Sequence, residues 1–267
     1  MIRRGYAPPI LAIPAVVGLA FLVLPLAALV GRVQWSTLWA DITSTEALDA
    51  LRLSVTTGLV ATVLCVLVGV PLALLIARAG ARLASVLRAL VTVPLVLPPM
   101  VGGLALLFLF GRAGWLAGTG WQIPFTTTAV ILAQTFVALP FLVLALEGSL
   151  RTSGVDYERT AAALGAGRWT ILRRVTLPLA APGLLSGVIL CFARAIGEFG
   201  ATALFAGNAP GTTQTMPLAI YTAFNGAGVT QGSAVALSLL LLVTAVLVLL
   251  LVRAWRPSAA PVAGGVR

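Results

Sequence analysis

The sequence contains no lysine and no histidine, so all 17 of its basic residues are arginine. A phosphate-binding P-loop requires a lysine that contacts the phosphates of the nucleotide. The chain therefore carries no Walker A site, and any nucleotide energy has to come from a partner. Zinc sites usually use histidine or clustered cysteine, whereas Cys65 and Cys191 each stand alone in an apolar run. This placement predicts packing of small side chains rather than a metal site or a disulfide.

Charged residues are also scarce. They make up 9% of the 267 residues, whereas 60% are hydrophobic, and the mean hydropathy is +1.09. A water-soluble core of this size does not need so many apolar residues, so the composition predicts a polytopic membrane protein. The net charge of +10 does not indicate a nucleic-acid partner, because the arginines are spread among the ends of apolar segments rather than gathered in one basic domain.

Six apolar stretches are long enough to cross a bilayer, which takes about 20 residues. They are residues 10–31, 53–77, 86–110, 126–146, 177–206 and 233–252. The first follows two arginines, as in a signal peptide. Its apolar run is longer than the hydrophobic region of a signal peptide, and it has no obvious small-residue cleavage site, so we expect a retained helix. The predicted fold class is all-α with six transmembrane helices.

The arginines also predict the orientation. Thirteen of the 17 lie in the N-terminus, residues 78–88, residues 151–174 and the tail from residue 253, whereas the alternate loops hold three. Positive charge is retained on the cytoplasmic side. We therefore expect a multi-pass protein of the cell membrane, in contact with its lipid, with both termini and the loop at residues 156–178 in the cytoplasm. The loop at residues 207–231 has no charge and is expected to face outward.

Prolines stand at mid-depth in several predicted spans, most densely in the third, where Pro94, Pro98 and Pro99 precede Gly102 and Gly103. Each proline removes a backbone donor and bends a helix, which lipid tolerates only where neighbouring helices cover the freed carbonyls. These spans either pack as ordinary kinked helices or line a path. The glycines indicate close contact between helices. No internal repeat is seen, so an inverted-repeat transporter is not supported.

Residues 156–178, DYERTAAALGAGRWTILRRVTLP, form a strongly charged loop between two predicted spans. The pattern predicts a short helix over residues 156–164, ended by Gly165 in a left-handed conformation. A second short helix is predicted over residues 168–175, ended at Leu177-Pro178 because the residue before a proline disfavours helix. We call this segment the knob. Its apolar anchors and arginines suit either a groove on a partner protein or anionic lipid headgroups.

The knob resembles the EAA loop of type I ABC-transporter permeases, whose short helices dock into an ATPase subunit. Members usually read E-A-A, two residues, L-G, which would place glutamate at Arg159 and alanine at Thr160, whereas the glutamate here stands one place earlier. The resemblance implies a coupling role for Glu158, Ala161, Ala162, Leu164, Gly165, Trp169, Leu177 and Pro178.

The fifth predicted span carries two ionisable residues, Arg194 and Glu198, within the run FARAIGEFGAT at residues 192–202. They stand four apart, on one helix face, so they can neutralise each other. A lone charge at the bilayer centre costs at least about 2.5 kcal/mol, so pairing or an aqueous cavity is required. Two interpretations are open. Either Arg194 lies on a path for an anion and Glu198 holds it, or the pair locks helices together.

This run and residues 205–221 are similar to the molybdate permeases of the molybdate/sulfate branch, as are residues 95–104 and 133–140. The resemblance implies Arg194, Glu198 and Thr202 as candidates for the translocation path or gate. It implies a homodimer, two cytoplasmic ATPase subunits and an external molybdate-binding protein, with no cofactor. Sulfate and thiosulfate permeases share the Arg194 and Glu198 pattern, while residues 199–202 and 213–221 favour molybdate or tungstate.

Two other classes of function remain as alternatives. A proton-coupled transporter would use Glu198 as its titrating group and need no ATPase. A membrane enzyme would need a catalytic constellation, and none can be assembled without histidine, lysine or clustered acids. The expected organisation is an N-terminal helix and external loop (residues 1–50), a five-helix permease core containing the coupling loop 155–178 (residues 51–253), and a cytoplasmic tail (residues 254–267).

Overall fold

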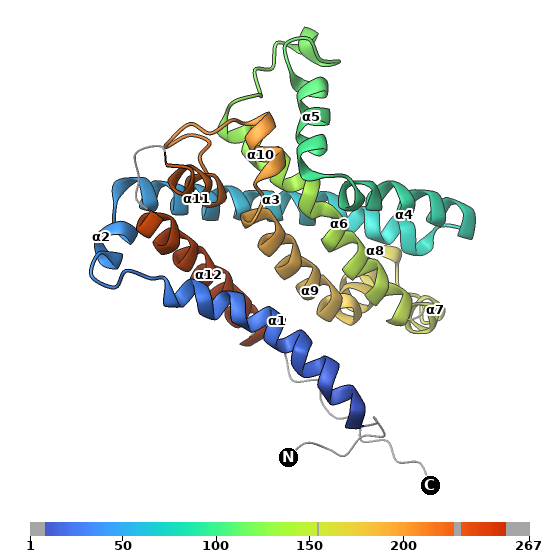
Figure 1. Cartoon of the computed structure of the whole chain (residues 1–267). Coiled ribbons are helices and arrows are strands. Elements are labelled where there is room, and N and C mark those ends of the chain that lie inside the picture. The colour runs from blue at the N-terminus through green and yellow to red at the C-terminus, as the bar shows by residue number, and fades with distance from the viewer. Residues whose placement is uncertain (1–8, 154, 227–230, 255–267) are drawn as a thin grey trace.

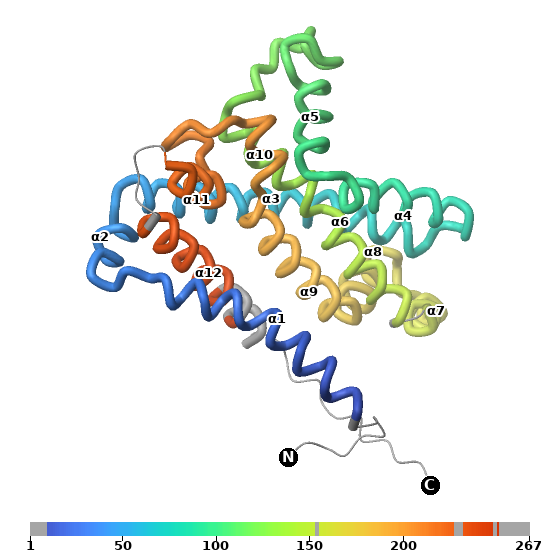
Figure 2. The backbone as a smooth tube through the Cα atoms, viewed as in Figure 1, coloured from blue at the N-terminus to red at the C-terminus, as the bar shows by residue number. Residues whose placement is uncertain are grey.

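The computed structural model describes residues 9–153, 155–226 and 231–254, and every regular element within them is helical. The elements are η1 (Pro9–Leu11), α1 (Ala12–Gly31), α2 (Leu38–Ile42), α3 (Thr45–Arg78), α4 (Ala81–Val96), α5 (Pro99–Phe110), η2 (Ala117–Thr119), α6 (Thr127–Ser153), α7 (Asp156–Ala163), α8 (Arg168–Ile171), η3 (Leu172–Thr176), α9 (Leu177–Ile196), α10 (Gly200–Phe205), α11 (Met216–Phe224) and α12 (Gln231–Ala254). The all-α prediction is confirmed. Figures 1 and 2 show α7 and α8 at one end of the bundle, and α10 and α11 away from that end.

The core lies where α3, α6 and α9 pack against one another. One of its clusters consists of small or medium side chains, including Ala61 and Cys65 of α3 and Cys191 and Ala195 of α9. Small residues let helix backbones approach closely, which drives packing inside a bilayer. Both cysteines are buried free thiols within this cluster, in agreement with the predicted packing role. By contrast, α1 lies on the outside beside α12 (Figure 1), and all its residues are exposed or half-buried.

The predicted count of six spans is not matched in full. Four helices are long and apolar enough to cross a membrane: Ala12–Gly31, Thr45–Arg78, Thr127–Thr152 and Arg168–Ile196. The bent pair of α4 and α5 makes a fifth if it is counted as one span. The sixth predicted segment is helical as α12, but its apolar part among the described residues, Gly232–Leu247, is shorter.

The third predicted span is broken rather than continuous. Helix α4 ends at Val96, α5 begins at Pro99, and the two axes differ by 110°. Leu97 and Pro98 between them have extended backbone, with ψ of 136° and 133°. Each of these residues precedes a proline, whose ring disfavours helix at the position before it. The prolines therefore produce a sharp corner here, whereas Pro71 and Pro140 lie inside α3 and α6, which continue through them.

The fifth predicted span also differs at both ends. The second helix of the knob does not stop at Leu177-Pro178, because α8, η3 and α9 follow one another without a gap. Within this join η3 is a π turn, and the N–H of Leu177 donates to the carbonyl of Leu172. The wider turn accommodates the ring of Pro178, which would otherwise clash with a carbonyl of the preceding turn. At the other end α9 stops at Ile196, and a separate helix, α10, begins at Gly200.

The start of α3 and helix α11 are among the helical segments that were not predicted. Helix α3 begins at Thr45, eight residues before the predicted start, because Ser44 caps it by accepting a hydrogen bond from the N–H of Ala47 at 3.2 Å. Helix α11 lies within the predicted outer loop, and the N–H of its first residue, Met216, donates to Oγ of Ser54 at 2.7 Å. This bond joins the uncharged segment after α10 to the first part of α3.

Candidate functional site

The knob is a helix, a glycine turn and a second helix, as predicted. Helix α7 ends at Ala163, and Gly165 has a φ of +87°, in the left-handed region that favours glycine. The N–H groups of Gly165 and Ala166 donate to the carbonyls of Ala162 and Ala161. These bonds satisfy carbonyls at the end of α7 that would otherwise lack partners. The turn therefore reverses the chain so that α8 packs against α7.

The exposed surface of the knob carries three large apolar side chains beside charged ones such as Asp156 and Arg159. Tyr157, Leu164 and Trp169 are 65%, 84% and 67% exposed, and Ala162 is also exposed. The guanidinium of Arg173 lies 5.7 Å from the centre of the Trp169 ring, within cation–π range. Exposed large apolar side chains that gather on a short projecting segment indicate a contact surface. Of the predicted apolar anchors, Trp169 is exposed to a partner, whereas Ile171 and Leu172 are half-buried and line the pocket beside Glu158.

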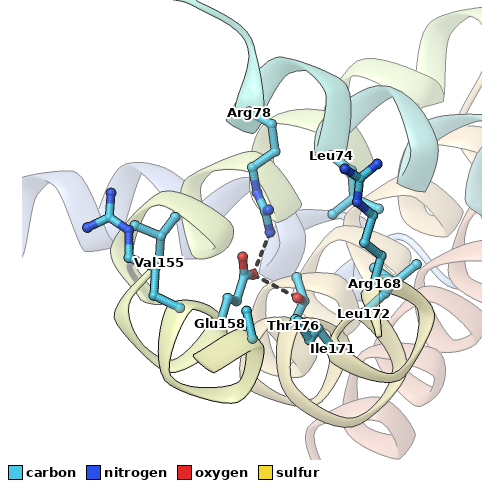
Figure 3. Close-up of a pocket in the computed structure, with 10 residues that line it drawn as sticks. Leu74, Arg78, Val155, Glu158, Arg168, Ile171, Leu172 and Thr176 are labelled. Carbon is cyan, nitrogen blue, oxygen red and sulfur yellow. Dashed lines mark hydrogen bonds and ion pairs between the residues drawn. The ribbon is translucent and has the colours of Figure 1, made fainter. Parts of the chain in front are cut away.

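The inner surface of the knob holds Glu158, which points toward the bundle (Figure 3). Its Oε1 accepts hydrogen bonds from Nη2 of Arg78, at the end of α3, and from Oγ1 of Thr176, which lies 2.7 Å away. The Glu158 side chain is 13% exposed. A pocket of about 560 Å³ lies beside these residues and is also lined by Leu74 and Arg168. Glu158 is therefore engaged within the chain, whereas its neighbour Arg159 is exposed.

A second buried carboxylate, Glu147 of α6, was not identified from the sequence. It accepts hydrogen bonds from Arg88 of α4, with a shortest distance of 2.7 Å, and from Arg151 at 3.3 Å. The Glu147 side chain is 6% exposed. This contact ties α4 to α6. In the sequence Glu147 appears only as one acidic residue at the end of an apolar run. Its partner Arg88 lies 59 residues away in the chain, so local spacing does not indicate the pair.

The predicted pair in the fifth span is present. Nη1 of Arg194 lies 2.6 Å from Oε2 of Glu198, and the two side chains are 27% and 1% exposed. Glu198 follows the end of α9 and has a second role, because its Oε1 accepts a hydrogen bond from the N–H of Ala201 at 2.7 Å. That N–H belongs to the first turn of α10, where backbone donors lack partners within the helix. The carboxylate therefore holds both the arginine and the start of α10.

The two broken spans meet at this point. A Cβ added to Gly200 of α10 would lie 3.1 Å from Cβ of Pro99, the first residue of α5. A Cβ added to Gly103 of α5 would lie only 2.6 Å from the carbonyl oxygen of Ala201. Helices α5 and α10 thus touch backbone to backbone, which confirms the predicted close contact near Gly103. Non-helical backbone at membrane depth is tolerated where it is buried in protein or lines a cavity.

Buried polar atoms without partners lie in the same part of the bundle. Thr202 of α10 is fully buried, and its Oγ1 has no hydrogen-bond partner among the described residues. The amide nitrogen and oxygen of the buried Gln134, on α6, lack partners in the same sense. Such groups cost about 1–3 kcal/mol each, so they need an explanation. Gln134 was not identified from the sequence, where it stands as a single amide within an apolar span.

Comparison with known proteins gives the following relatives. Residues 69–260 match the family described as binding-protein-dependent transport system inner membrane component. The molybdenum transport system permease protein ModB of Mycobacterium tuberculosis is 54% identical over 250 residues, which cover 92% of this chain and 93% of that protein. A probable molybdenum ABC transporter permease protein of Haloferax volcanii is 43% identical over 225 residues, 83% of this chain and 81% of that protein. The sulfate transport system permease protein CysT of Escherichia coli is 34% identical over 207 residues, 75% of each chain.

Two solved structures have a similar fold. A chain of the MetNI methionine ABC transporter, in an inward-facing conformation, superposes with a TM-score of 0.63 at 21% identity, covering 79% of this chain and 96% of that one. A chain of the bacterial alginate ABC transporter, in complex with its alginate pentasaccharide-bound periplasmic protein, gives a TM-score of 0.67 at 18% identity and covers 91% of both chains. At these identities the likeness concerns the fold.

Proposed function

The chain belongs to the family of binding-protein-dependent transport system inner membrane components, the permeases of ABC transporters, and on this premise we propose that it carries molybdate into the cell in an ATP-driven importer. It is a transport subunit and not an enzyme, since ATP hydrolysis in this family resides in a separate subunit. The observation that supports molybdate as the substrate is the 54% identity, over nearly the whole chain, to a molybdenum permease. The sulfate permease CysT is 34% identical over a shorter part.

In this proposal the knob is the docking element for the ATPase. Its support is the exposed apolar surface formed by Tyr157, Leu164 and Trp169, with the small Ala162 allowing close approach. Aromatic anchors on a small projecting segment are typical of residues that carry binding energy. Gly165 gives the turn its shape. Leu177 and Pro178 begin α9, so they connect the docking element to the membrane helices rather than contact the ATPase.

The proposed assembly contains two copies of this chain, two cytoplasmic ATPase subunits and one external binding protein. It lies in the cell membrane with both termini in the cytoplasm, on the side of the knob. The arginine distribution supports this orientation. We retain the division into residues 1–50, 51–253 and 254–267. The predicted tail lies outside the described residues from residue 255 onward.

The proposed gate is the junction where α5 and α10 meet beside Arg194, Glu198 and Thr202. Molybdate is an oxyanion that only accepts hydrogen bonds, so a path for it needs donors. Thr202 has a buried hydroxyl with no partner among the described residues, and Arg194 is partly exposed while Glu198 holds it. Discontinuous helices form ion sites in several transporter classes because their free backbone groups face the ion. Rocking of the two copies would open this junction first to the outside and then to the cytoplasm.

Uptake by vesicles tests the function. Vesicles that contain this chain, its ATPase and its binding protein should accumulate labelled molybdate when ATP is supplied inside the compartment that holds the ATPase. Excess unlabelled molybdate should abolish the signal, whereas sulfate at the same concentration should reduce it much less. Inhibition by sulfate as strong as that by molybdate would favour a sulfate permease. Accumulation driven by a pH gradient without the ATPase would overturn the proposal in favour of proton coupling.

A further inference from the structure

Three elements converge on one carboxylate oxygen beneath the knob (Figure 3). Oε1 of Glu158, on α7, accepts from Arg78, the last residue of α3, and from Thr176, the last residue before α9. Arg78 and Glu158 are 80 residues apart in sequence, and Thr176 follows Glu158 by 18 residues. A single side chain of α7 therefore contacts the end of α3 and the π turn that leads into α9, two segments that continue into core helices.

Glu158 supplies the side-chain hydrogen bonds that tie α7 to other elements among the described residues. Six of the eight residues of α7 are exposed, and the exceptions are Glu158 and Ala161. Ala161 offers one methyl group, whereas Glu158 offers a carboxylate with two hydrogen bonds. Thr176 is buried, and the Glu158 side chain is 13% exposed. A carboxylate withdrawn this far from water depends on its partners, so the loss of its charge should release α7.

Beyond α7 the chain has a turn and then a single long helical body. The turn contains Gly165, with a φ of +87°, and Gly167, and a Cβ added to either glycine would meet no atom within 4 Å. From Arg168 the chain is helical to Ile196, a span of 29 residues that is about 43 Å long at 1.5 Å per residue. This body carries Trp169 at one end and Arg194 at the other. A displacement at α8 reaches the proposed gate directly, whereas one at α7 must cross the turn.

We propose that the contacts of Glu158 with Arg78 and Thr176 form a clasp that fixes α7 against the end of α3 and the π turn that leads into α9, so that movement of the docked ATPase is transmitted to the membrane helices. The inference deepens the proposed function and rests on it. Glu158 is a positioning residue that does not itself contact the ATPase. Without the clasp α7 pivots at the glycine turn, the ATPase still docks and hydrolyses ATP, and the part of the movement that is transmitted through α7 is lost before it reaches α9.

The test compares Glu158→Gln with Asp156→Asn in the complete complex. Glu158→Gln keeps the shape of the side chain and removes its charge. We expect it to retain ATPase co-purification and ATP hydrolysis while molybdate uptake per ATP hydrolysed falls about tenfold. Asp156→Asn removes the same charge two residues away, where the side chain is 91% exposed and lies 3.8 Å from Arg159. It should leave uptake per ATP unchanged. Equal ratios in the two variants would overturn the clasp, as would loss of ATPase binding in Glu158→Gln alone.

Exchange of the charges of Arg78 and Glu158 should restore molybdate uptake per ATP hydrolysed, which would not happen if the single variants were simply misfolded. Arg78→Glu alone places two carboxylates together and should uncouple transport, whereas Arg78→Glu with Glu158→Arg should recover at least half of the wild-type ratio of uptake to ATP hydrolysed.

A spin label at Arg159, in a chain with both cysteines replaced, reports whether the clasp is intact and needs no substrate. Its mobility should rise in Glu158→Gln. If the label moves as expected but wild-type complex takes up no molybdate, the proposed substrate is wrong and the clasp stands; an immobile label in the variant overturns the clasp.

Discussion

At the scale of single residues, the proposed gate depends on how one buried carboxylate is shared. Glu198 is 1% exposed and contacts both Arg194 and the N–H of Ala201. A buried ion pair is weak evidence for stability, since the cost of removing two charges from water can equal the attraction between them. Removal of one partner is different, because it leaves a buried charge without compensation. The two open interpretations of Arg194, anion path or helix lock, can be separated on this basis.

We predict that Arg194→Gln lowers stability more than Arg194→Gln combined with Glu198→Gln. The single change leaves the Glu198 charge buried and should cost about 3 kcal/mol, whereas the double change should cost about 1 kcal/mol, because a neutral side chain can still accept from Ala201. Thermal unfolding of the purified chain in detergent measures both. Similar melting temperatures for the two variants would contradict the pairing argument.

The same double variant distinguishes the two interpretations of Arg194, which are contact with the transported anion and locking of the helices. If Arg194 contacts the anion during transport, the double variant should fold, bind the ATPase and still lose at least about tenfold in uptake, because the path has lost its fixed cation. If the pair only locks the helices, the neutral Gln pair should restore uptake along with stability. Uptake measured beside the melting temperature of each sample separates these outcomes.

At the scale of elements, the corner between α4 and α5 and the break between α9 and α10 form one structural unit. The first break lies at Pro98 and Pro99 and the second between Gly197 and Gly200, and the two short helices that follow them touch through Gly103 and Ala201. The contact has no room for a side chain at Gly103, since the nearest neighbour is a backbone oxygen that cannot rotate away. Packing at this point therefore controls how α5 and α10 can move relative to each other.

We predict that Gly103→Ala destabilises the chain by about 1–3 kcal/mol and impairs uptake, because the added methyl group pushes α5 from α10. The matched control is Gly148→Ala in α6, where an added Cβ meets no atom within 4 Å. Alanine there should be neutral or should stabilise the helix by about 0.5–1 kcal/mol. Thermal unfolding of the two variants, run side by side, checks the difference. Equal stability would show that the α5–α10 contact yields easily.

The knob is the other element with a definite prediction. Ala162→Trp should abolish co-purification of the ATPase while membrane insertion stays normal, because the indole adds bulk at an exposed position of α7 that also lines the pocket beside Glu158. Gly165→Pro should have the same effect, since proline cannot adopt the φ of +87° that the turn requires. Thr119→Trp, in the exposed η2 segment, provides a bulky change elsewhere. Undiminished co-purification of Ala162→Trp would remove the proposed docking surface.

At the scale of the whole molecule, the packing of the chain leaves many large apolar side chains exposed. All of α1 lies outside the core, and on α9 Leu190 is 48% exposed next to the exposed small residues Ala193 and Gly197. Lipid can cover such surfaces, but the α9 face also carries the partly exposed Arg194. A charge on an exposed helix face within the membrane belongs against protein or water. This face is therefore where we place the second copy of the chain.

We predict that Ala193→Cys, in a chain with both native cysteines replaced, gives a cross-linked dimer on mild oxidation in membranes. The small side chains at positions 193 and 197 allow the two α9 helices to approach closely. Leu67→Cys on α3 is the control, because Leu67 is 64% exposed on a different helix. Equal cross-linking at the two positions, or a purified chain that stays monomeric, would contradict this arrangement.

Much of the element pattern followed from local sequence. The apolar runs located the long helices, Gly165 marked the turn of the knob, and the spacing of Arg194 and Glu198 predicted their pairing. The predictions that were wrong rest on residues, such as proline, that are compatible with more than one local structure. Pro98 and Pro99 stand at a sharp corner, whereas Pro178 is accommodated in a continuous helix by a π turn. The presence of a proline in the sequence does not predict which of these structures forms. The residues around each proline, supplied by neighbouring helices, decide between them.

Composition and local spacing are enough to establish that this protein is helical, that it lies in a membrane, and that it has no P-loop of its own for ATP. These properties depend on composition and on spacings of a few residues, which chain geometry converts directly into helix faces and spans. Packing in three dimensions then brings Glu158 to Arg78 and Thr176, brings Glu147 to Arg88, and joins two broken spans at Gly103. Those contacts connect residues far apart in the chain, and they arise because close packing of α3, α6 and α9 brings particular side chains into reach of one another.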